Sequence, residues 1–171
     1  MTYLSKALDR DLSDEPITVL VIDDEEGPRE SLRMILKERC SVLTAKNEEE
    51  AIQRLTASSI DVDIVALDIR LGNRNGIEVL QKIKQMAPDV EVFLITGYPS
   101  TETAVRAMRF GAYDYIVKPF DTRMVREVVR RGVLRQGQSL FEKREKIRTN
   151  RIKVNPKGER REAYGKDTTA I

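Results

Sequence analysis

Histidine is absent from all 171 residues of the sequence, which also has no tryptophan and only one cysteine. Without histidine, the chain cannot contain a Ser-His or Cys-His nucleophile, a His-ligated zinc site or a phosphohistidine. The single thiol, Cys40, cannot form an internal disulfide, which agrees with a reducing compartment. Chemistry at any site of this chain must therefore use carboxylates, hydroxyls, Lys and Arg, and the compatible metal is a hard, oxygen-bound cation.

Long apolar segments are missing as well. No run approaches the roughly 20 residues that a membrane-spanning helix needs. Residues 1–14 mix charges and lack the apolar core of a signal peptide. We therefore expect a cytoplasmic protein with no membrane partner.

Charge is distributed unevenly along the chain, although the net charge is only +2. Residues 139–171 contain ten Lys or Arg and five Asp or Glu. The body of the protein is therefore mildly acidic and the C-terminal segment is basic. We expect a flexible leader at 1–15, one domain at 16–137 and a basic, mobile tail at 138–171.

Four short apolar runs each end in polar or turn residues, a pattern typical of strands buried on both faces of a sheet. These runs are Val19–Ile22 before Asp23 and Asp24, Ile64–Leu67 before Asp68, Val92–Ile95 before Thr96, and Tyr115–Val117 before Lys118.

Segments with helical periodicity alternate with these runs, which predicts an α/β fold with a parallel sheet covered on both faces. Five strand–helix units in about 120 residues match the doubly wound, flavodoxin-like fold with strand order 2-1-3-4-5. The expected strands are 17–22, 41–44, 62–67, 91–95 and 113–117. The first expected helix begins at 27–28. The other four are expected at 48–57, 77–86, 101–110 and 122–136.

Ligands of such folds bind beyond the carboxyl ends of the strands, where these polar residues lie. Asp23, Asp24 and Asp68 would repel one another there unless a divalent cation such as Mg²⁺ bridged them. Lys118 and Thr96 would neutralise and hydrogen-bond an anionic ligand. The available nucleophile is then a carboxylate, which can form an acyl phosphate.

In this combination of motifs, residues 16–137 resemble the receiver domain of two-component response regulators. The acidic pair Asp23-Asp24, the loop from Asp68 to Gly76, Thr96-Gly97, and the segment from Tyr115 through Lys118-Pro119 carry the resemblance. The sequences at 26–32 and 101–121 are most similar to those of receiver domains attached to enhancer-binding ATPase activators. Neither their ATPase domain nor a helix-turn-helix follows in this sequence.

The resemblance implies that Asp68 accepts a phosphoryl group from the phosphohistidine of a partner histidine kinase or phosphotransfer protein. It implies Mg²⁺ bound by Asp24, Asp68 and the main-chain carbonyl of Arg70, with Asp23 acting largely through water. Thr96 and Lys118 would hold the phosphoryl oxygens, and the Lys118-Pro119 bond would be cis. The only reaction expected is the protein's own phosphorylation and dephosphorylation, so it is not an enzyme acting on other substrates.

The resemblance also implies a switch, in which Thr96 moves toward the phosphoryl group and Tyr115 swings inward. The changed surface would comprise the fourth helix, fifth strand and fifth helix, within residues 101–136, where a homodimer or a downstream protein would bind. One departure is Gly72, where the family commonly has Pro, so we expect a looser loop.

Three other interpretations follow from the same residues. A pseudo-receiver would act as a binding module without phosphorylation, although the intact acidic set, Thr96 and Lys118 argue against it. A regulator linked to DNA or RNA through the basic tail is disfavoured because five acidic residues interrupt the tail and no recognition motif is present. An aspartate-nucleophile phosphatase usually places two Asp residues two positions apart, whereas Asp23 and Asp24 are adjacent.

Overall fold

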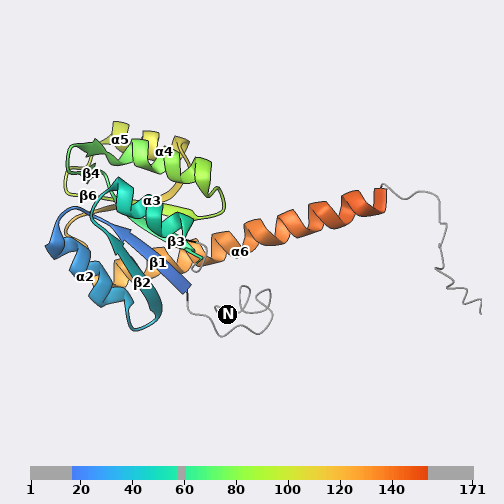
Figure 1. Cartoon of the computed structure of the whole chain (residues 1–171), viewed down its shortest axis with the longest axis horizontal. Helices are drawn as coiled ribbons and strands as arrows, with labels where there is room; N and C mark the ends of the chain where they lie inside the picture. The colour runs from blue at the N-terminus through green and yellow to red at the C-terminus, as the bar shows by residue number, and fades with distance from the viewer. Residues whose placement is uncertain (1–16, 58–60, 154–171) are drawn as a thin grey trace, which may run out of the picture. The chain divides into compact units, whose positions relative to one another are not determined.

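The computed structural model describes residues 17–57 and 61–153, with side chains described as far as Gln138. The expected leader at 1–15 and the end of the expected tail, 154–171, lie outside the described residues. Five parallel strands form one sheet in the order β2-β1-β3-β6-β7. Numbered by sheet strand alone, this is the predicted order 2-1-3-4-5, and the α/β doubly wound fold is confirmed (Figure 1).

The helices and strands alternate along the chain as the sequence predicts. The strands of the main sheet are β1 (Ile17–Ile22), β2 (Cys40–Ala45), β3 (Ile64–Asp68), β6 (Glu91–Thr96) and β7 (Ala112–Val117). The helices are α2 (Glu26–Leu36), α3 (Glu48–Thr56), α4 (Gly76–Met86), α5 (Thr101–Arg109) and α6 (Thr122–Lys153). A small hairpin, β4 (Arg70–Leu71) and β5 (Arg74–Asn75), lies between β3 and α4.

Alternate residues of each central strand face two separate hydrophobic cores, which explains the continuous apolar runs. Leu20 and Ile22 of β1 point into a core that α3, α4 and α5 cover, here called the α4-side core. Val19 and Val21 point into a core that α2 and α6 cover, here called the α6-side core. The carboxyl ends of the strands lie at one edge of both cores, where polar residues border an open cleft.

Three segments differ from the prediction by more than one residue at an end or in kind. Strand β3 begins at Ile64 rather than at residue 62, because the Asp63 carboxylate replaces regular ladder pairing. Its Oδ2 accepts a hydrogen bond from Thr18 N at 2.8 Å while its own N–H donates to Thr18 O at 2.9 Å. The last helix, expected to end near 136, continues to Lys153. Gly137 lies within this helix at a cost of only about 1 kcal/mol, and strong helix formers follow it.

The third difference is the loop 69–75, which we expected to be looser because Gly72 replaces the family's Pro. It instead forms the β4–β5 hairpin, with Gly72 and Asn73 as its two-residue turn. Gly72 has φ +61°, the positive value that such turns require at the first central position and that Pro cannot adopt. The Pro-to-Gly difference therefore accompanies an ordered hairpin.

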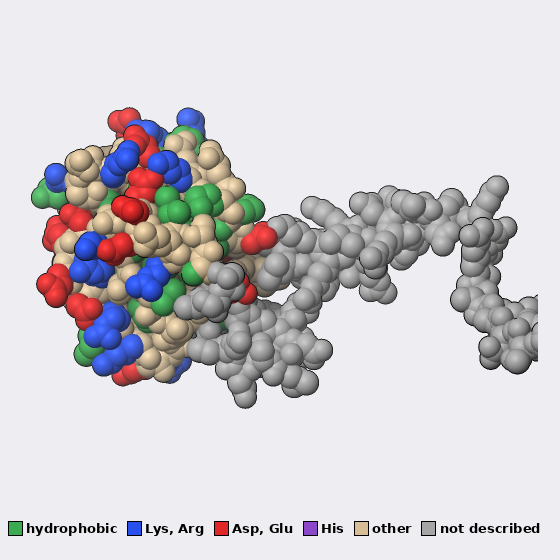
Figure 2. All heavy atoms as spheres, viewed as in Figure 1, with side chains coloured by type: hydrophobic (Ala, Val, Ile, Leu, Met, Phe, Trp, Pro, Cys, Tyr) green, Lys and Arg blue, Asp and Glu red, His purple; other side chains and the backbone are tan. Residues whose placement is uncertain are grey.

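Acidic and basic side chains are intermixed on the face of the domain shown in Figure 2. Within the part of the chain that the structure describes, no helix combines the length and apolarity needed to cross a membrane.

Gly132 lies inside α6, and a substitution at this position tests how closely the helix packs on the sheet. A Cβ at this position would lie 2.5 Å from the hydroxyl oxygen of Tyr113 and 3.0 Å from Cδ1 of Ile64. Gly132→Ala should therefore lower the free energy of unfolding by about 1–3 kcal/mol, although Ala is normally the better helix residue. Urea denaturation followed by circular dichroism measures the change.

Gly27, in the first turn of α2, is the matched control, because a Cβ there meets nothing within 4 Å. Gly27→Ala should be neutral or stabilising by up to about 1 kcal/mol. Stabilisation by both substitutions would contradict the close contact between α6 and Tyr113.

Candidate functional site at the carboxyl ends of the strands

Four polar residues lie at the carboxyl ends of neighbouring strands. Asp23 follows β1, Asp68 ends β3, Thr96 ends β6 and Lys118 follows β7. Main-chain pairing continues to these positions, since Lys118 N donates to Thr96 O at 2.7 Å. The parallel register of the sheet therefore brings together side chains that are up to 95 positions apart in the sequence.

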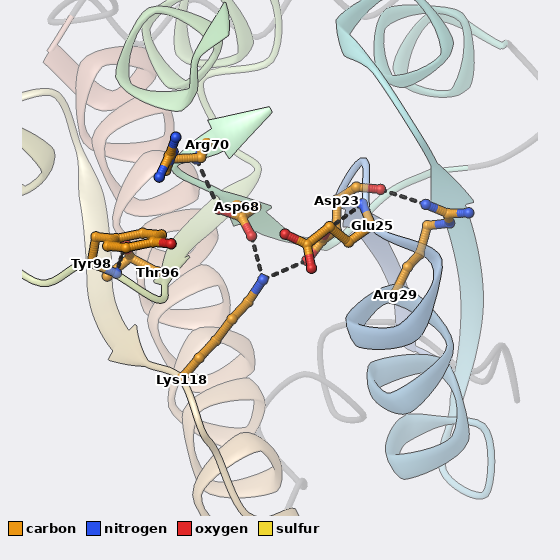
Figure 3. A network of polar contacts seen from close by, with 8 residues as sticks. All are labelled: Asp23, Glu25, Arg29, Asp68, Arg70, Thr96, Tyr98 and Lys118. Carbon is orange, nitrogen blue, oxygen red and sulfur yellow. Dashed lines mark hydrogen bonds and ion pairs between the residues drawn. The ribbon is translucent and has the colours of Figure 1, made fainter. Parts of the chain in front are cut away.

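The Lys118 ammonium group connects two buried carboxylates. Its Nζ donates to Oδ2 of Asp23 at 3.0 Å and also contacts Oδ2 of Asp68 (Figure 3). The side chains of Asp23 and Asp68 are 2% and 7% exposed, and that of Lys118 is 19% exposed. The positive charge offsets the repulsion between two carboxylates that share a largely dry space.

Burial and charge act in opposite directions on the pKa values of these groups. Burial raises the pKa of Asp23, and the hydrogen bond from Lys118 opposes this rise only in part. Burial alone would lower the pKa of Lys118, but its hydrogen bonds to Asp68 and Asp23 outweigh that effect and raise it. Lys118 is therefore held firmly in its charged form.

A recurring local turn fixes the second oxygen of each carboxylate. In this turn a side-chain oxygen accepts a hydrogen bond from the main-chain N–H two residues later, as Asx and Ser/Thr turns do. The turn occurs in Asp23 to Glu25 at 2.8 Å, Asp68 to Arg70 at 2.8 Å and Thr96 to Tyr98 at 3.0 Å. The Thr96 hydroxyl oxygen is thus at the correct strand end but hydrogen-bonded to Tyr98, not to Asp68.

A cleft opens beside these groups. Asp24 is exposed on its wall, and the other lining residues are Glu25, Asp68, Arg70, Gly72, Gly97, Tyr98 and Lys118. Among the described residues no group of three or more acidic side chains is close enough to form a ready-made metal site. The predicted convergence of Asp23, Asp24 and Asp68 is thus incomplete, since Asp23 and Asp68 share Lys118 while Asp24 faces solvent.

A β-bulge determines where Tyr115 points. In the pairing of β6 with β7, Val92 aligns with Ala112 and Phe93 with Asp114, so Tyr113 has no partner. This extra residue shifts the alternation of faces. Tyr113 consequently packs in the α6-side core and Tyr115 against the α4-side core. In the described part of the chain the Tyr115 hydroxyl is buried without a hydrogen-bond partner.

The structure adds contacts that sequence reasoning missed. Arg29, one turn into α2, donates to the main-chain oxygen of Asp23 at 2.6 Å, which fixes the start of that loop. The Arg70 guanidinium lies 4.6 Å from the centre of the Tyr98 ring. Neither contact was predicted from spacing, because the first joins a side chain to a main-chain oxygen six residues earlier and the second joins side chains of two separate loops. The Lys118-Pro119 bond is cis, as the resemblance implies.

Comparison with known proteins agrees with this geometry. The sequence model of the response regulator receiver domain matches residues 19–130. The transcriptional regulatory protein ZraR of Klebsiella oxytoca is 35% identical over 111 residues, which cover 64% of this chain and 25% of ZraR. The response regulator PilR of Pseudomonas aeruginosa is also 35% identical, over 64% of this chain and 24% of PilR. The chain thus spans about a quarter of the length of these curated relatives.

Solved structures give the same result. The receiver domain of NtrX from Brucella abortus is 35% identical, with a TM-score of 0.63, over 67% of this chain and 97% of that one. The CheY-like receiver domain from Methanospirillum hungatei has a TM-score of 0.68 at 26% identity, over 73% and 99% of the two chains. Since the family match covers well over half of the sequence, the chain belongs to the response regulator receiver domain family.

Proposed function

We propose that Asp68 accepts a phosphoryl group from the phosphohistidine of a partner histidine kinase or phosphotransfer protein. The contact of Lys118 with the Asp68 carboxylate, at the edge of an open cleft, carries this proposal. No histidine occurs among the 171 residues, so the donor lies outside this sequence. In the reaction an Asp68 oxygen attacks the phosphorus, the P–N bond to the donor histidine breaks, and the imidazole takes up a proton.

The residues of the cleft have distinct roles in this reaction. Lys118 contacts a phosphoryl oxygen and offsets its negative charge. Thr96 turns its hydroxyl from the Tyr98 N–H toward another phosphoryl oxygen. The N–H of Arg70 already holds Oδ1 of Asp68 at 2.8 Å, which fixes the orientation of the attacking carboxylate.

The oxygen-rich donor set of the cleft fits Mg²⁺, which prefers carboxylates, carbonyls and water. Asp24, Asp68 and the main-chain carbonyl of Arg70 would hold the ion directly, and Asp23 would act largely through water. When bound, Mg²⁺ offsets negative charge on the transferring phosphoryl group. The exposed carboxylate of Asp24 is available for this role without breaking an existing contact with Lys118.

Phosphorylation of Asp68 changes the surface formed by α5, β7 and α6. Movement of Thr96 makes room for Tyr115, whose ring already lies against the α4-side core. Several large apolar side chains are exposed on this surface, namely Val105, Met108, Val117 and Met124. A homodimer or a downstream protein that binds within residues 101–136 would cover them. A relative that is 32% identical, the NtrC4 receiver domain, is described as a dimer when activated by beryllofluoride.

Phosphorylation of Asp68 is tested directly with acetyl phosphate and Mg²⁺. The wild-type protein should gain the mass of one phosphoryl group, which maps to the peptide containing Asp68, whereas Asp68→Asn should gain none. Asp61→Asn removes an exposed carboxylate outside the cleft and should behave like the wild type. A wild-type protein that stays unmodified with both acetyl phosphate and a histidine kinase would favour a pseudo-receiver.

Removal of the Lys118 charge tests the proposed Mg²⁺ site. Lys118→Gln should lower the free energy of unfolding by about 1–3 kcal/mol, because two buried carboxylates lose their shared cation. Mg²⁺ should restore part of this loss relative to NaCl at equal ionic strength, as urea denaturation would show. Lys82→Gln removes a half-exposed cation from Glu48, which keeps its pair with Arg74, and should cost at most about 1 kcal/mol. An identical response of both variants to Mg²⁺ would argue against the site.

The output surface is tested by size-exclusion chromatography with light scattering. Beryllofluoride and Mg²⁺ should convert the wild-type protein to a dimer. Met108→Glu, which places a charge on the exposed apolar surface of α5, should remain monomeric. Met34→Glu alters an exposed methionine on α2, outside this surface, and should dimerise normally. Dimerisation of Met108→Glu at wild-type affinity would place the interface elsewhere.

A further inference from the structure

A second hollow opens between the C-terminal ends of α4 and α5, two helices that lie side by side on one face of the sheet (Figure 1). It borders the amino ends of β6 and β7, at the opposite edge of the sheet from Asp68. Its volume is about 620 Å³, which is in the range of small-molecule sites. Among the described residues no acidic side chain lines it. We call this hollow the α4–α5 groove.

Lys84 of α4 provides one positive charge in the groove. A Cβ at position 111 would lie 3.4 Å from Cε of Lys84, so the lysine stem packs directly on the Gly111 main chain. The φ of +92° at Gly111 is a value that favours glycine. Nζ of Lys84 donates to Val90 O at 2.6 Å. Since an ammonium group has three N–H donors, this bond fixes its position and leaves capacity to bind an anion.

Burial of the Lys84 ammonium has a cost that an anion in the groove would reduce. Burial lowers the pKa of Lys84, Glu91 and Asp89 oppose that change, and Arg135 adds to it. Glu91 is itself paired with Arg135 at 3.7 Å. A negative group bound beside Nζ would favour the charged form of Lys84.

Arg109 provides a second positive charge from the last turn of α5. In the described part of the chain its guanidinium has no hydrogen bond, ion pair or ring contact. Stabilisation of the helix end does not require it, because Arg106 lies in the same last turn. The C-terminal ends of α4 and α5 carry about half a negative charge each, which two full positive charges exceed. The groove therefore suits an anion.

The remaining side chains of the groove suit an aromatic ring with polar edges. Phe110, directly after α5, is 37% exposed and lies beside Arg109 along the chain. Gln81 and Gln85 are one helical turn apart and flank Lys84 on the same face of α4. Each carboxamide both donates and accepts hydrogen bonds, as the edge of a nucleobase does.

We propose that the α4–α5 groove binds a nucleoside monophosphate. The phosphate contacts Arg109 and Lys84, the base stacks on Phe110, and the edge of the base forms hydrogen bonds with Gln81 or Gln85. A simple inorganic anion would use only the two cations of the groove. The site is separate from the Asp68 cleft, with which it shares no lining residue. A bound nucleotide would bridge α4 and α5, and α5 belongs to the proposed output surface.

Binding is tested by two-dimensional NMR of the ¹⁵N-labelled full chain, with EDTA present to remove divalent cations. AMP, GMP, CMP and UMP are each titrated to about 5 mM. At least one should shift the main-chain N–H signals of 81–85 and 109–111 in a saturable way. The matching nucleoside, which lacks the phosphate, and ribose 5-phosphate, which lacks the base, should each bind at least about fivefold more weakly.

Two variants test the assigned contacts. Arg109→Gln should weaken binding of the nucleotide about tenfold, because a charge-assisted contact with the phosphate is lost. Phe110→Leu keeps apolar bulk but removes the ring, and should weaken binding at least about threefold. Arg106→Gln is the matched control, because it removes the same charge from the same turn of α5, outside the residues that line the groove. It should bind as the wild type does, and urea denaturation should show that all variants remain folded.

Three results would overturn the proposal. They are the absence of saturable shifts with every nucleotide, equal affinity for ribose 5-phosphate and the nucleotide, and equal weakening by Arg106→Gln and Arg109→Gln. Asp68→Asn, which removes the proposed phosphoacceptor, should bind the nucleotide as the wild type does. Failure of phosphorylation and failure of nucleotide binding are therefore distinguished by separate measurements.

Discussion

The shared contact of Lys118 with Asp23 and Asp68 is the interaction on which the site depends. Two carboxylates with almost no exposure would repel each other without the intervening ammonium group. Their positions are set by the sheet, since each lies at the carboxyl end of a buried strand. A slip of one residue in any of these strands would turn its polar end away and would exchange the side chains that face the two cores. The two hydrophobic cores thus hold the charges together.

The same sheet connects the site with both covering layers of helices. The bulge at Tyr113 sends this ring into the α6-side core, where its hydroxyl donates to Val128 O at 3.0 Å. Tyr115, two residues later, faces the α4-side core. One strand, β7, therefore carries a residue that contacts α6 and a residue that packs against the α4-side core. Asp114, between them, forms an ion pair with Arg131 of α6. The local register of β7 thus decides which side chain faces each layer of helices.

Most secondary structure was predictable because local rules and tertiary packing agree. The Asn47 side chain accepts a hydrogen bond from Glu50 N at 2.9 Å, as expected of an N-cap residue. The continuous apolar runs form strands buried on both faces, as their composition predicts. The predicted boundaries were wrong where a specific tertiary contact, and not the local sequence, decided where an element begins or ends. Asp63 shortened β3 through its side chain, and the turn at Gly72 required pairing between β4 and β5 that no local pattern revealed.

The sequence by itself determined the order of the elements, the strand order of the sheet and the kinds of groups at its edge. Absence of histidine limited the possible chemistry to carboxylates, hydroxyls, Lys and Arg, and the position of Asp68 after an apolar run made it the candidate nucleophile. Only the tertiary structure decided that Lys118 contacts both Asp23 and Asp68, that the Thr96 hydroxyl accepts from Tyr98 N, and that Arg70 stacks on Tyr98. Periodicity reports which face a residue occupies, whereas such contacts depend on side-chain torsions and on distances between loops, which are set when the whole domain packs.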